Sequence, residues 1–170
     1  MKTVLKNKIF SWFRLVRLPN LFTAPGDVVC GFLLAGGSQQ SSDFIYLFCG
    51  CWIAFFAYAF GIITNDIADV QEDMRIRPER PIPSGAISRK EALFGVFICL
   101  CFILIPSFIS WKLCFATVVL LTFICLYNFY FKTKPLLGPV FMALCRIQSF
   151  GVGIIGLVPI PFSRIGVIAL

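Results

Sequence analysis

The sequence contains no histidine and few acidic residues, and both shortages restrict what this chain can do. Of its 170 residues only eight are Asp or Glu, against fifteen Lys and Arg, and charged residues make up 14%. Without histidine, the chain lacks the commonest general base, the commonest transition-metal ligand and any Ser-His or Cys-His catalytic pair. No acidic residue follows Glu91, so a second carboxylate cluster cannot occur in the later part of the sequence.

Apolar residues, by contrast, are abundant. They make up 59% of the chain, and the mean hydropathy of +0.90 is too high for a soluble domain of this size. Residues 44–64 form an uncharged run of 21 residues, long enough at ~1.5 Å per residue to cross a hydrocarbon core of about 30 Å. The sequence therefore predicts an all-α, multi-pass transmembrane helical bundle that forms a single domain over residues 1–170.

Similar apolar runs bring the expected number of spans to about five. The first run, residues 18–37, is interrupted by Pro25 and Asp27, and an intramembrane carboxylate usually faces a bundle interior or a watery cavity. Residues 161–170 begin a further apolar stretch that is too short for a span. The other expected spans cover residues 92–110, 113–131 and 136–160.

Basic residues are distributed unevenly between the two sides of the expected bundle. Five precede the first span, five lie between the second and third, and two follow the fourth, whereas the opposite loops hold only Lys112 and Arg164. By the positive-inside rule, the N-terminus and the loop after the second span are cytoplasmic, and the expected location is the cell membrane. The net charge of +7 then reflects topology and anionic lipid head groups, and no nucleic-acid partner is expected.

Half of the acidic residues lie at the end of the second expected span, where residues 65–73 read Asn-Asp-Ile-Ala-Asp-Val-Gln-Glu-Asp. If the helix continues through this stretch, Asn65, Asp69 and Asp73 share one face, and Asp66 lies about 100° to the side. Carboxylate and amide oxygens at one per turn suit Mg²⁺, which is often shared between protein carboxylates and the oxygens of a substrate phosphate.

A segment rich in arginine and proline follows immediately, and residues 75–85 read Arg-Ile-Arg-Pro-Glu-Arg-Pro-Ile-Pro-Ser-Gly. Guanidinium groups bind phosphate oxygens in a bidentate manner, and prolines reduce the conformational freedom that is lost when a loop closes over a ligand. A metal on one side and Arg77 and Arg80 on the other would hold a diphosphate in a cytoplasmic active-site loop over residues 65–90. The spacing equally allows a solvated loop in which acids and bases pair with each other.

In this order, the two segments resemble the first aspartate-rich motif of the UbiA superfamily of intramembrane prenyltransferases. The resemblance rests on Asn65-Asp66-x-x-Asp69-x-x-x-Asp73 and on Arg-Pro-x-Arg-Pro-Ile-Pro-Ser-Gly at residues 77–85. In that family the motif ends the second transmembrane helix and holds Mg²⁺ against the diphosphate of an isoprenoid donor. The resemblance implies that Asn65, Asp69 and Asp73 face the metal with Asp66 beside them, and that Asp69 and Asp73 are catalytic.

Two further segments agree with the resemblance. Residues 17–20, Arg-Leu-Pro-Asn, are similar to an N-terminal arginine segment of the family. The stretch from Tyr127 to Lys132 resembles the family's Tyr-x4-Lys ending of the fourth helix, whose lysine approaches the diphosphate. The family commonly has an arginine next, whereas this chain has Thr133, so one expected phosphate donor is missing.

Arg146 lies within the last expected span, in a region where the family often places an arginine. An intramembrane charge needs a partner or a role. The resemblance suggests contact with the diphosphate, and the alternative is a structural ion pair with Asp27. The diphosphate-binding residues implied by the resemblance are Arg17, Arg77, Arg80, Tyr127, Lys132 and Arg146.

The resemblance covers nearly the entire chain but only the first half of the family's fold. That fold has about nine helices in two related halves, and a second aspartate-rich motif in the later half supplies a second metal site. Loss of one metal is expected to raise the reaction barrier by several kcal/mol. Three explanations are open: the protein continues beyond this sequence, it is a truncated inert product, or a second polypeptide supplies the missing C-terminal half.

The resemblance implies Mg²⁺-dependent transfer of a prenyl group from an isoprenoid diphosphate to an unidentified acceptor within the membrane. The donor would ionise at the aspartates, the acceptor would attack the carbocation, and a proton would leave. The alternative is a non-catalytic membrane protein, either a truncated remnant or a subunit that binds diphosphate or lipid head groups. A transporter is disfavoured because the charges gather at one side of the membrane, whereas transport sites usually lie near the midplane.

Overall fold

The computed structural model describes residues 2–37 and 41–155, with side chains from residues 8–37 and 43–155, and this part of the chain is almost entirely helical. No strand occurs in these residues, so the all-α prediction is confirmed. The elements in chain order are α1 (Lys2–Leu15), α2 (Leu18–Leu21), α3 (Ala24–Leu34), α4 (Ser41–Ala68), α5 (Val70–Ile76), α6 (Arg89–Ser107), α7 (Trp111–Leu126), the π-helical turn η1 (Tyr127–Phe131) and α8 (Leu137–Ile155).

Four segments are long and apolar enough to cross a membrane, and they correspond to the second to fifth predicted spans. The predicted residues 156–160 of the last span, and the stretch 161–170, lie outside the described residues. The four segments are Asp43–Ala68, Arg89–Ser107, Trp111–Phe131 and Leu137–Ile155.

The first predicted span is shorter than the others and is broken. Its helical part covers Leu18–Leu34, which at ~1.5 Å per residue reaches about 26 Å, somewhat less than a hydrocarbon core. The break lies between α2 and α3, where Pro25 occupies the first turn of α3, a position that favours helix initiation. Among the described residues, the bundle therefore has four full-length spans, and a short, interrupted helix takes the place of the first predicted span.

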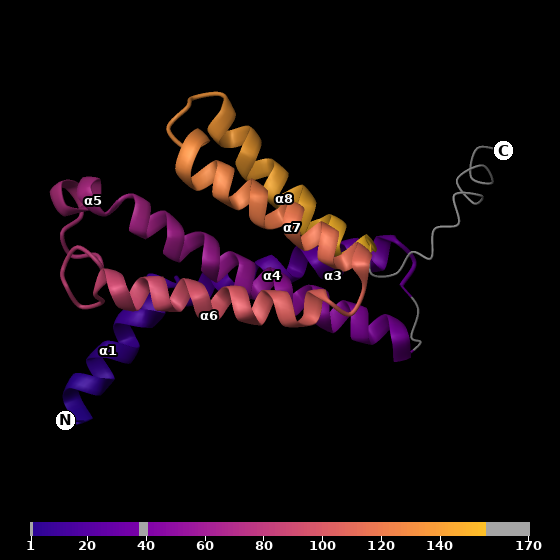
Figure 1. Cartoon of the computed structure of the whole chain (residues 1–170), viewed down its shortest axis with the longest axis horizontal. Coiled ribbons are helices and arrows are strands. Elements are labelled where there is room, and N and C mark those ends of the chain that lie inside the picture. The colour runs from indigo at the N-terminus through magenta and orange to yellow at the C-terminus, as the bar shows by residue number, and fades with distance from the viewer. Residues whose placement is uncertain (1, 38–40, 156–170) are drawn as a thin grey trace.

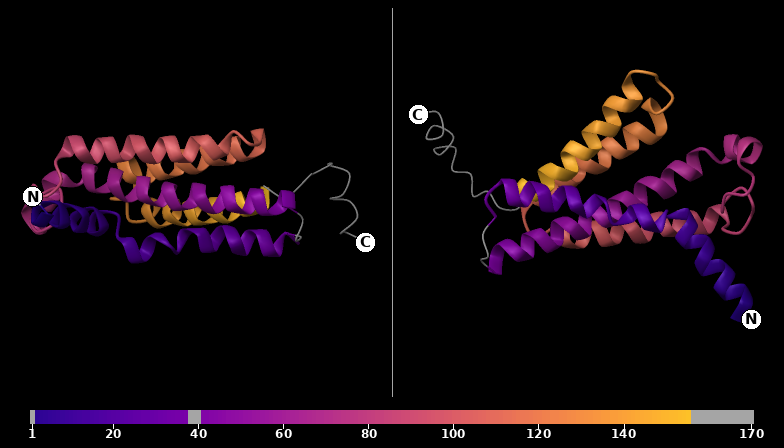
Figure 2. Two further views of the ribbon diagram at one scale, coloured as in Figure 1. Left: turned by 90° about the horizontal axis from the view of Figure 1, so that it is seen from below. Right: turned by 180° about the vertical axis from the view of Figure 1, so that it is seen from behind.

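The helices form two neighbouring pairs. α4 lies beside α6 and α7 beside α8, and the two pairs diverge toward the end that carries α5 (Figure 1). α3 packs against both α4 and α8, and Figure 2 shows α4 between α3 and α6. α1 projects away from the bundle at an angle (Figures 1 and 2).

Glycines bring α3 and α8 into close contact. A Cβ atom on Gly31 would lie 2.2 Å from the carbonyl oxygen of Phe150, and one on Gly153 would lie 2.1 Å from that of Val28. Small residues allow such close backbone approach between membrane helices. The two helices run in the same direction, because α4, α6 and α7, which alternate in direction, separate them in the chain.

The connection between α5 and α6 is fixed to the bundle. Ile82 and Ile87 are 6% and 0% exposed, so they anchor the connection in the core. Ser88 then caps α6 in a capping box with Glu91, which satisfies backbone N–H groups at the helix start. Glu91 also forms an ion pair with Lys8 of α1. The segment that carries Arg80 is therefore held in place at its C-terminal end.

Candidate functional site

A cavity of about 380 Å³ lies between α3, α4, α7 and α8. Its wall on α4 is a single helical face with the small residues Ala54, Ala57 and Gly61, and it ends at Asn65. Positions three or four residues apart stack along one face, so this wall extends over about 16 Å of helix. The cavity therefore leads from the acidic stretch into the membrane-spanning part of the bundle.

The acidic stretch continues α4 but is interrupted at Asp69. The backbone of Asp69 has φ −89° and ψ 2°, and α5 begins at the next residue. Two hydrogen bonds cross the interruption: the N–H of Asp69 donates to the Asn65 carbonyl (3.0 Å), and the N–H of Asp73 donates to the Asp69 carbonyl (2.8 Å). The helix expected through the stretch is present with one break, and the segment predicted as a loop, residues 65–90, is helical as far as Ile76.

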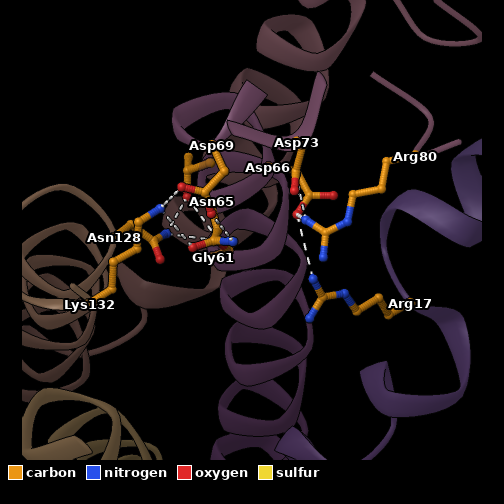
Figure 3. A network of polar contacts seen from close by, with 10 residues as sticks. Arg17, Gly61, Asn65, Asp66, Asp69, Asp73, Arg80, Asn128 and Lys132 are labelled. Carbon is orange, nitrogen blue, oxygen red and sulfur yellow. Dashed lines mark hydrogen bonds and ion pairs between the residues drawn. The ribbon is translucent and has the colours of Figure 1, made fainter. Parts of the chain in front are cut away.

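Asn65 and Asp69 form one polar group, on the side of α4 that faces η1 (Figure 3). Asn65 Nδ2 donates to Asp69 Oδ2 at 3.1 Å. Lys132 Nζ donates to Asn65 Oδ1 at 3.3 Å and forms a close ion pair with Asp69. One ammonium group therefore sits against both an amide oxygen and a carboxylate.

Asp66 and Asp73 form a second polar group around Arg80 (Figure 3). Arg80 Nη1 donates to Asp73 Oδ2 at 2.6 Å and lies 3.5 Å from Asp66 Oδ1. Both residues are buried, at 4% and 5% exposure, and burying a charge is costly unless it is paired. Asp73 thus lies with Asp66, and not with Asn65 and Asp69 as predicted. Residues seven apart return to nearly the same side of a helix, whereas Asn65 and Asp73, eight apart, differ by about 80°.

Arg17 contributes a second guanidinium to Asp66, with Nη2 3.5 Å from Oδ1. It links α1 to α2 in the left-handed conformation, with φ 51°, and is the only residue other than glycine in the described chain with positive φ. Such a backbone costs about 1–2 kcal/mol, and strain of this kind persists where surrounding contacts hold it. Arg17 also lines the cavity, so it connects the second polar group with the hollow interior.

The motif aspartates are all paired with basic side chains, as the alternative of an internally paired segment expected. Arg77 differs from the other motif arginine: its side chain is exposed, and it forms no ion pair with a carboxylate of the described residues. It lies at the end of α5, where its N–H donates to the Asp73 carbonyl at 2.8 Å. The structure therefore brings Arg17, Arg80 and Lys132 to the acidic stretch but leaves the Arg77 side chain outside it.

A π-helical turn directs Lys132 toward α4. In this turn the N–H of Lys132 donates to the carbonyl of Tyr127, five residues earlier, at 3.0 Å. π-helical turns are rare and often occur at functional sites. Tyr127, at the start of the turn, lines the cavity close to its mouth.

Asn128 fastens this turn to α4, and the sequence analysis missed it. Its Nδ2 donates to the Gly61 carbonyl and to Thr64 Oγ1, both at 2.8 Å, and its side chain is buried. The contact lies one turn before the polar group of Lys132, so it sets the position of that lysine. The available signal was an amide side chain in an otherwise apolar span, since such residues usually have a structural or functional role.

Arg146 lies on the α8 wall of the cavity and pairs with Asp27 of α3. Its Nη2 donates to Asp27 Oδ1 at 2.8 Å. The second carboxylate oxygen, Asp27 Oδ2, is buried and has no hydrogen-bond partner among the described residues. Of the two sequence-based expectations for Arg146, the structure shows the ion pair, and contact with a diphosphate stays a prediction.

The two polar groups along α4 and α5 have donor atoms that suit Mg²⁺. In each, two oxygen-bearing side chains surround one protein cation, Arg80 in one case and Lys132 in the other. Mg²⁺ is usually held by one or two carboxylates and completes its shell with water and phosphate oxygens. Within residues 2–37 and 41–155, no three His, Cys, Asp or Glu side chains gather to hold a metal alone. Either pair of oxygen-bearing side chains could supply part of a Mg²⁺ shell, with other oxygens, such as those of a phosphate, supplying the rest.

Known proteins resemble this chain in sequence. The sequence model of the UbiA prenyltransferase family matches residues 27–158. The digeranylgeranylglyceryl phosphate synthase of Methanococcus aeolicus is 34% identical over 129 residues, which are 75% of this chain and 44% of that protein. The protein of the same name from Methanocaldococcus jannaschii is 33% identical over 89 residues, 52% of this chain and 31% of that protein.

A solved structure has the same fold over most of the chain. It comes from a study of the "biosynthesis of Digeranylgeranylglyceryl phosphate synthase in membranes", with a TM-score of 0.77 and 26% identity over 86% of this chain and 52% of that one. The chain thus spans about half, or less, of the length of these relatives. With a family match over 132 of 170 residues, from position 27 to 158, this chain is a member of the UbiA prenyltransferase family.

Proposed function

We propose that this chain forms the donor-binding part of a Mg²⁺-dependent prenyltransferase that acts within the membrane. One observation supports this above the others: a cluster of carboxylates and cations opens directly into a largely apolar cavity, and Asn65 and Arg17 belong to both. An isoprenoid diphosphate has the same division, with a charged head and an apolar tail. By the positive-inside rule, the N-terminus and the mouth of the cavity face the cytoplasm.

Asn65, Asp66, Asp69 and Asp73 are the proposed metal-binding residues. Bound Mg²⁺ would act as a Lewis acid that stabilises the charge developing on the leaving diphosphate. Lys132 and Arg80 now neutralise the carboxylates. Both have long side chains that can turn to phosphate oxygens once the carboxylates have another cation. The protein cations therefore serve as counter-ions before substrate binding and as diphosphate ligands after it.

Other parts of the chain support this arrangement. Arg17, Arg77 and Tyr127 complete the proposed diphosphate-binding set, and Asn128 positions Lys132. The apolar walls of the cavity exclude water, which would otherwise capture the allylic cation before the acceptor attacks. Because the chain matches only part of its relatives, we propose that a C-terminal half, in the same or another polypeptide, supplies the second metal site.

Binding of geranylgeranyl diphosphate to the purified protein, with and without Mg²⁺, tests the proposal. We expect Mg²⁺-dependent binding that weakens at least about tenfold in Asp73→Asn, because loss of one charge-assisted contact is worth about 1.5–3 kcal/mol. Glu72→Gln is the matched control, since it removes an exposed neighbouring carboxylate and should change nothing. Absence of Mg²⁺-dependent binding would contradict the proposal, and binding without turnover would favour a non-catalytic diphosphate-binding subunit.

A further inference from the structure

Pro106 leaves one backbone carbonyl of α6 without its usual partner. It lies inside the helix, one residue before the end at Ser107. In an α-helix each N–H donates to the carbonyl four residues earlier, but proline has no N–H. The carbonyl of Phe102 therefore receives no such bond from position 106. In a membrane-spanning segment an unpaired backbone group is costly, because lipid tails offer no hydrogen-bond donor.

The indole of Trp52, on α4, bonds to the freed carbonyl. Its Nε1–H donates to the Phe102 carbonyl oxygen at 3.0 Å, across 50 residues of sequence. A second carbonyl near this helix end, that of Leu104, accepts from Ser107 Oγ at 2.7 Å. Membrane helices tolerate proline where neighbouring helices or hydroxyl side chains satisfy the freed groups. The bond from Trp52 therefore supplies to α6 what Pro106 removes.

Trp52 is not placed where an indole N–H usually meets water. Tryptophans of membrane proteins are enriched at the two membrane–water interfaces. Trp52 is nine residues from the start of the span Asp43–Ala68, which at ~1.5 Å per residue is about 14 Å into the helix. A buried or lipid-surrounded indole N–H needs a partner from the protein, and the Phe102 carbonyl is that partner.

Aromatic rings orient the indole of Trp52. Its ring centroid lies 5.7 Å from that of Phe48, 5.1 Å from that of Phe56 and 5.9 Å from that of Phe102. The rings of Phe56 and Phe102 also stack on each other, with 4.8 Å between their centroids. The indole thus packs on its own helix and against α6 at once, and these contacts direct its N–H toward α6.

We propose that Trp52 and Pro106 act together to fix α6 in one register against the outer side of α4. Apolar packing is non-directional, whereas a hydrogen bond to one carbonyl specifies which residues of the two helices lie opposite each other. Trp52 is two residues from Ala54, which lines the cavity, and residues two apart lie on nearly opposite sides of a helix. The bond therefore supports the α4 wall from outside the cavity.

The bond complements the attachment of α6 at its other end. There Ile82 and Ile87 are buried and hold the connection that carries Arg80. Phe102 is only five residues before the opposite end of α6. With both ends attached, α6 cannot slide along α4 without breaking the bond from Trp52 or moving the connection. This inference depends on the contacts between the helices and not on the proposed function.

A double-mutant cycle between Trp52→Phe and Pro106→Ala tests the inference. Trp52→Phe keeps an aromatic ring but removes the N–H, so the Phe102 carbonyl is left unpaired. Pro106→Ala restores a backbone N–H that can donate to that carbonyl within α6. We expect Trp52→Phe to lower the melting temperature of the full chain in detergent by about 2–4 °C, and by less than half as much in the Pro106→Ala background. Equal shifts in both backgrounds would overturn the inference, because the two residues would then act independently.

Trp111→Phe is the matched control for this cycle. It removes an indole N–H from a tryptophan that is 77% exposed, so the melting temperature, followed by circular dichroism, should stay the same in both backgrounds. A shift as large as that of Trp52→Phe would mean that loss of any indole has this effect, and it would also overturn the inference.

The indole proton of Trp52 gives an independent readout in the folded protein. The chain has three tryptophans, so in NMR spectra of ¹⁵N-labelled protein the Trp52 resonance is the one that both Trp12→Phe and Trp111→Phe retain. We expect Pro106→Ala to move this resonance upfield, because the new backbone donor competes for the Phe102 carbonyl and weakens the indole bond. A resonance that does not move would show that Pro106 is not what frees the carbonyl for Trp52, and the inference would fail.

Discussion

The cavity has charged residues at its mouth, beside Asn65, and on its inner wall, at Asp27 and Arg146, and the two sets are arranged differently. At the mouth, Arg80 contacts two carboxylates and Asp66 contacts two arginines, so partners are shared. On the inner wall, Asp27 and Arg146 form a single hydrogen bond, and one carboxylate oxygen has no partner among the described residues. Both sets line or border one cavity, but only at the mouth are ionic partners shared between more than two residues.

This difference has a physical consequence for ligand binding. Shared counter-ions can exchange one carboxylate for a phosphate without leaving a buried charge unpaired, which is the costly outcome inside a protein. An isolated pair cannot exchange partners in this way. The mouth is therefore better suited than the inner wall to a highly charged ligand.

Asp69→Ala should have the largest effect, because it removes a carboxylate proposed to bind the metal. In a preparation that carries out prenyl transfer, we expect turnover to fall by roughly 10³-fold, the scale of losing a principal stabiliser of developing charge. Glu72→Ala, which removes an exposed carboxylate nearby, should retain turnover. Prenyl transfer at the wild-type rate in Asp69→Ala would show that the acidic residues at the mouth take no part in the reaction.

Asn128→Ala tests whether the mouth depends on the bond between η1 and α4. The change removes one part-buried and one buried hydrogen bond, so we expect the free energy of unfolding to fall by about 1–3 kcal/mol. Because Lys132 loses its position, the KM for the donor should rise about tenfold, which is the least that one charge-assisted contact is worth. The KM for the acceptor should stay the same. In Thr122→Ala, which loses an exposed local hydrogen bond to Val118, neither quantity should change appreciably.

Gly31→Ala tests the contact that aligns the inner pair. Its Cβ would lie 2.2 Å from the Phe150 carbonyl oxygen, so the two helices must separate, at a cost of about 1–3 kcal/mol in stability. Gly26→Ala is the matched control on the same helix, because nothing lies within 4 Å of its Cβ position. The melting temperature of each variant is measured by heating samples and recording the remaining folded protein by size-exclusion chromatography. Equal melting temperatures for the two variants would show that the close contact does not contribute to stability.

Arg17→Asn should have the smallest effect on stability. Asn adopts positive φ more readily than most residues, and this gain offsets the loss of a half-exposed ionic contact worth about 0–1 kcal/mol. We therefore expect the free energy of unfolding to change by less than about 1 kcal/mol, while donor affinity falls a few-fold. Unchanged donor affinity would place Arg17 outside the diphosphate site.

Much of the fold follows from the sequence because a membrane imposes simple requirements. The uncharged run at residues 44–64 corresponds to the span Asp43–Ala68, since uninterrupted apolar residues at bilayer length form helices. The pairing of Asp27 with Arg146 was also foreseeable as an alternative, because each is an isolated charge in an apolar run.

The division of the acidic stretch could have been predicted from the spacing but was missed. On a helix Asp66 and Asp73 lie within about 20° of each other, whereas Asn65 and Asp73 are about 80° apart, and the break at Asp69 leaves this division in place. Asn128 was missed for a different reason. Its importance comes from a π-helical turn and a contact 67 residues away in sequence, and neither leaves a periodic signal.

The parallel contact between α3 and α8 also has a consequence for biosynthesis. Asp27 and Arg146 are 119 residues apart, so at roughly 5–20 residues per second the ribosome supplies the arginine about 6–24 seconds after the aspartate. During that interval Asp27 lacks the ion pair that Arg146 later provides. Because α3 is short and interrupted, we expect it to stay near the lipid head groups until α8 is made. The hollow would then be completed only when the last described helix is inserted.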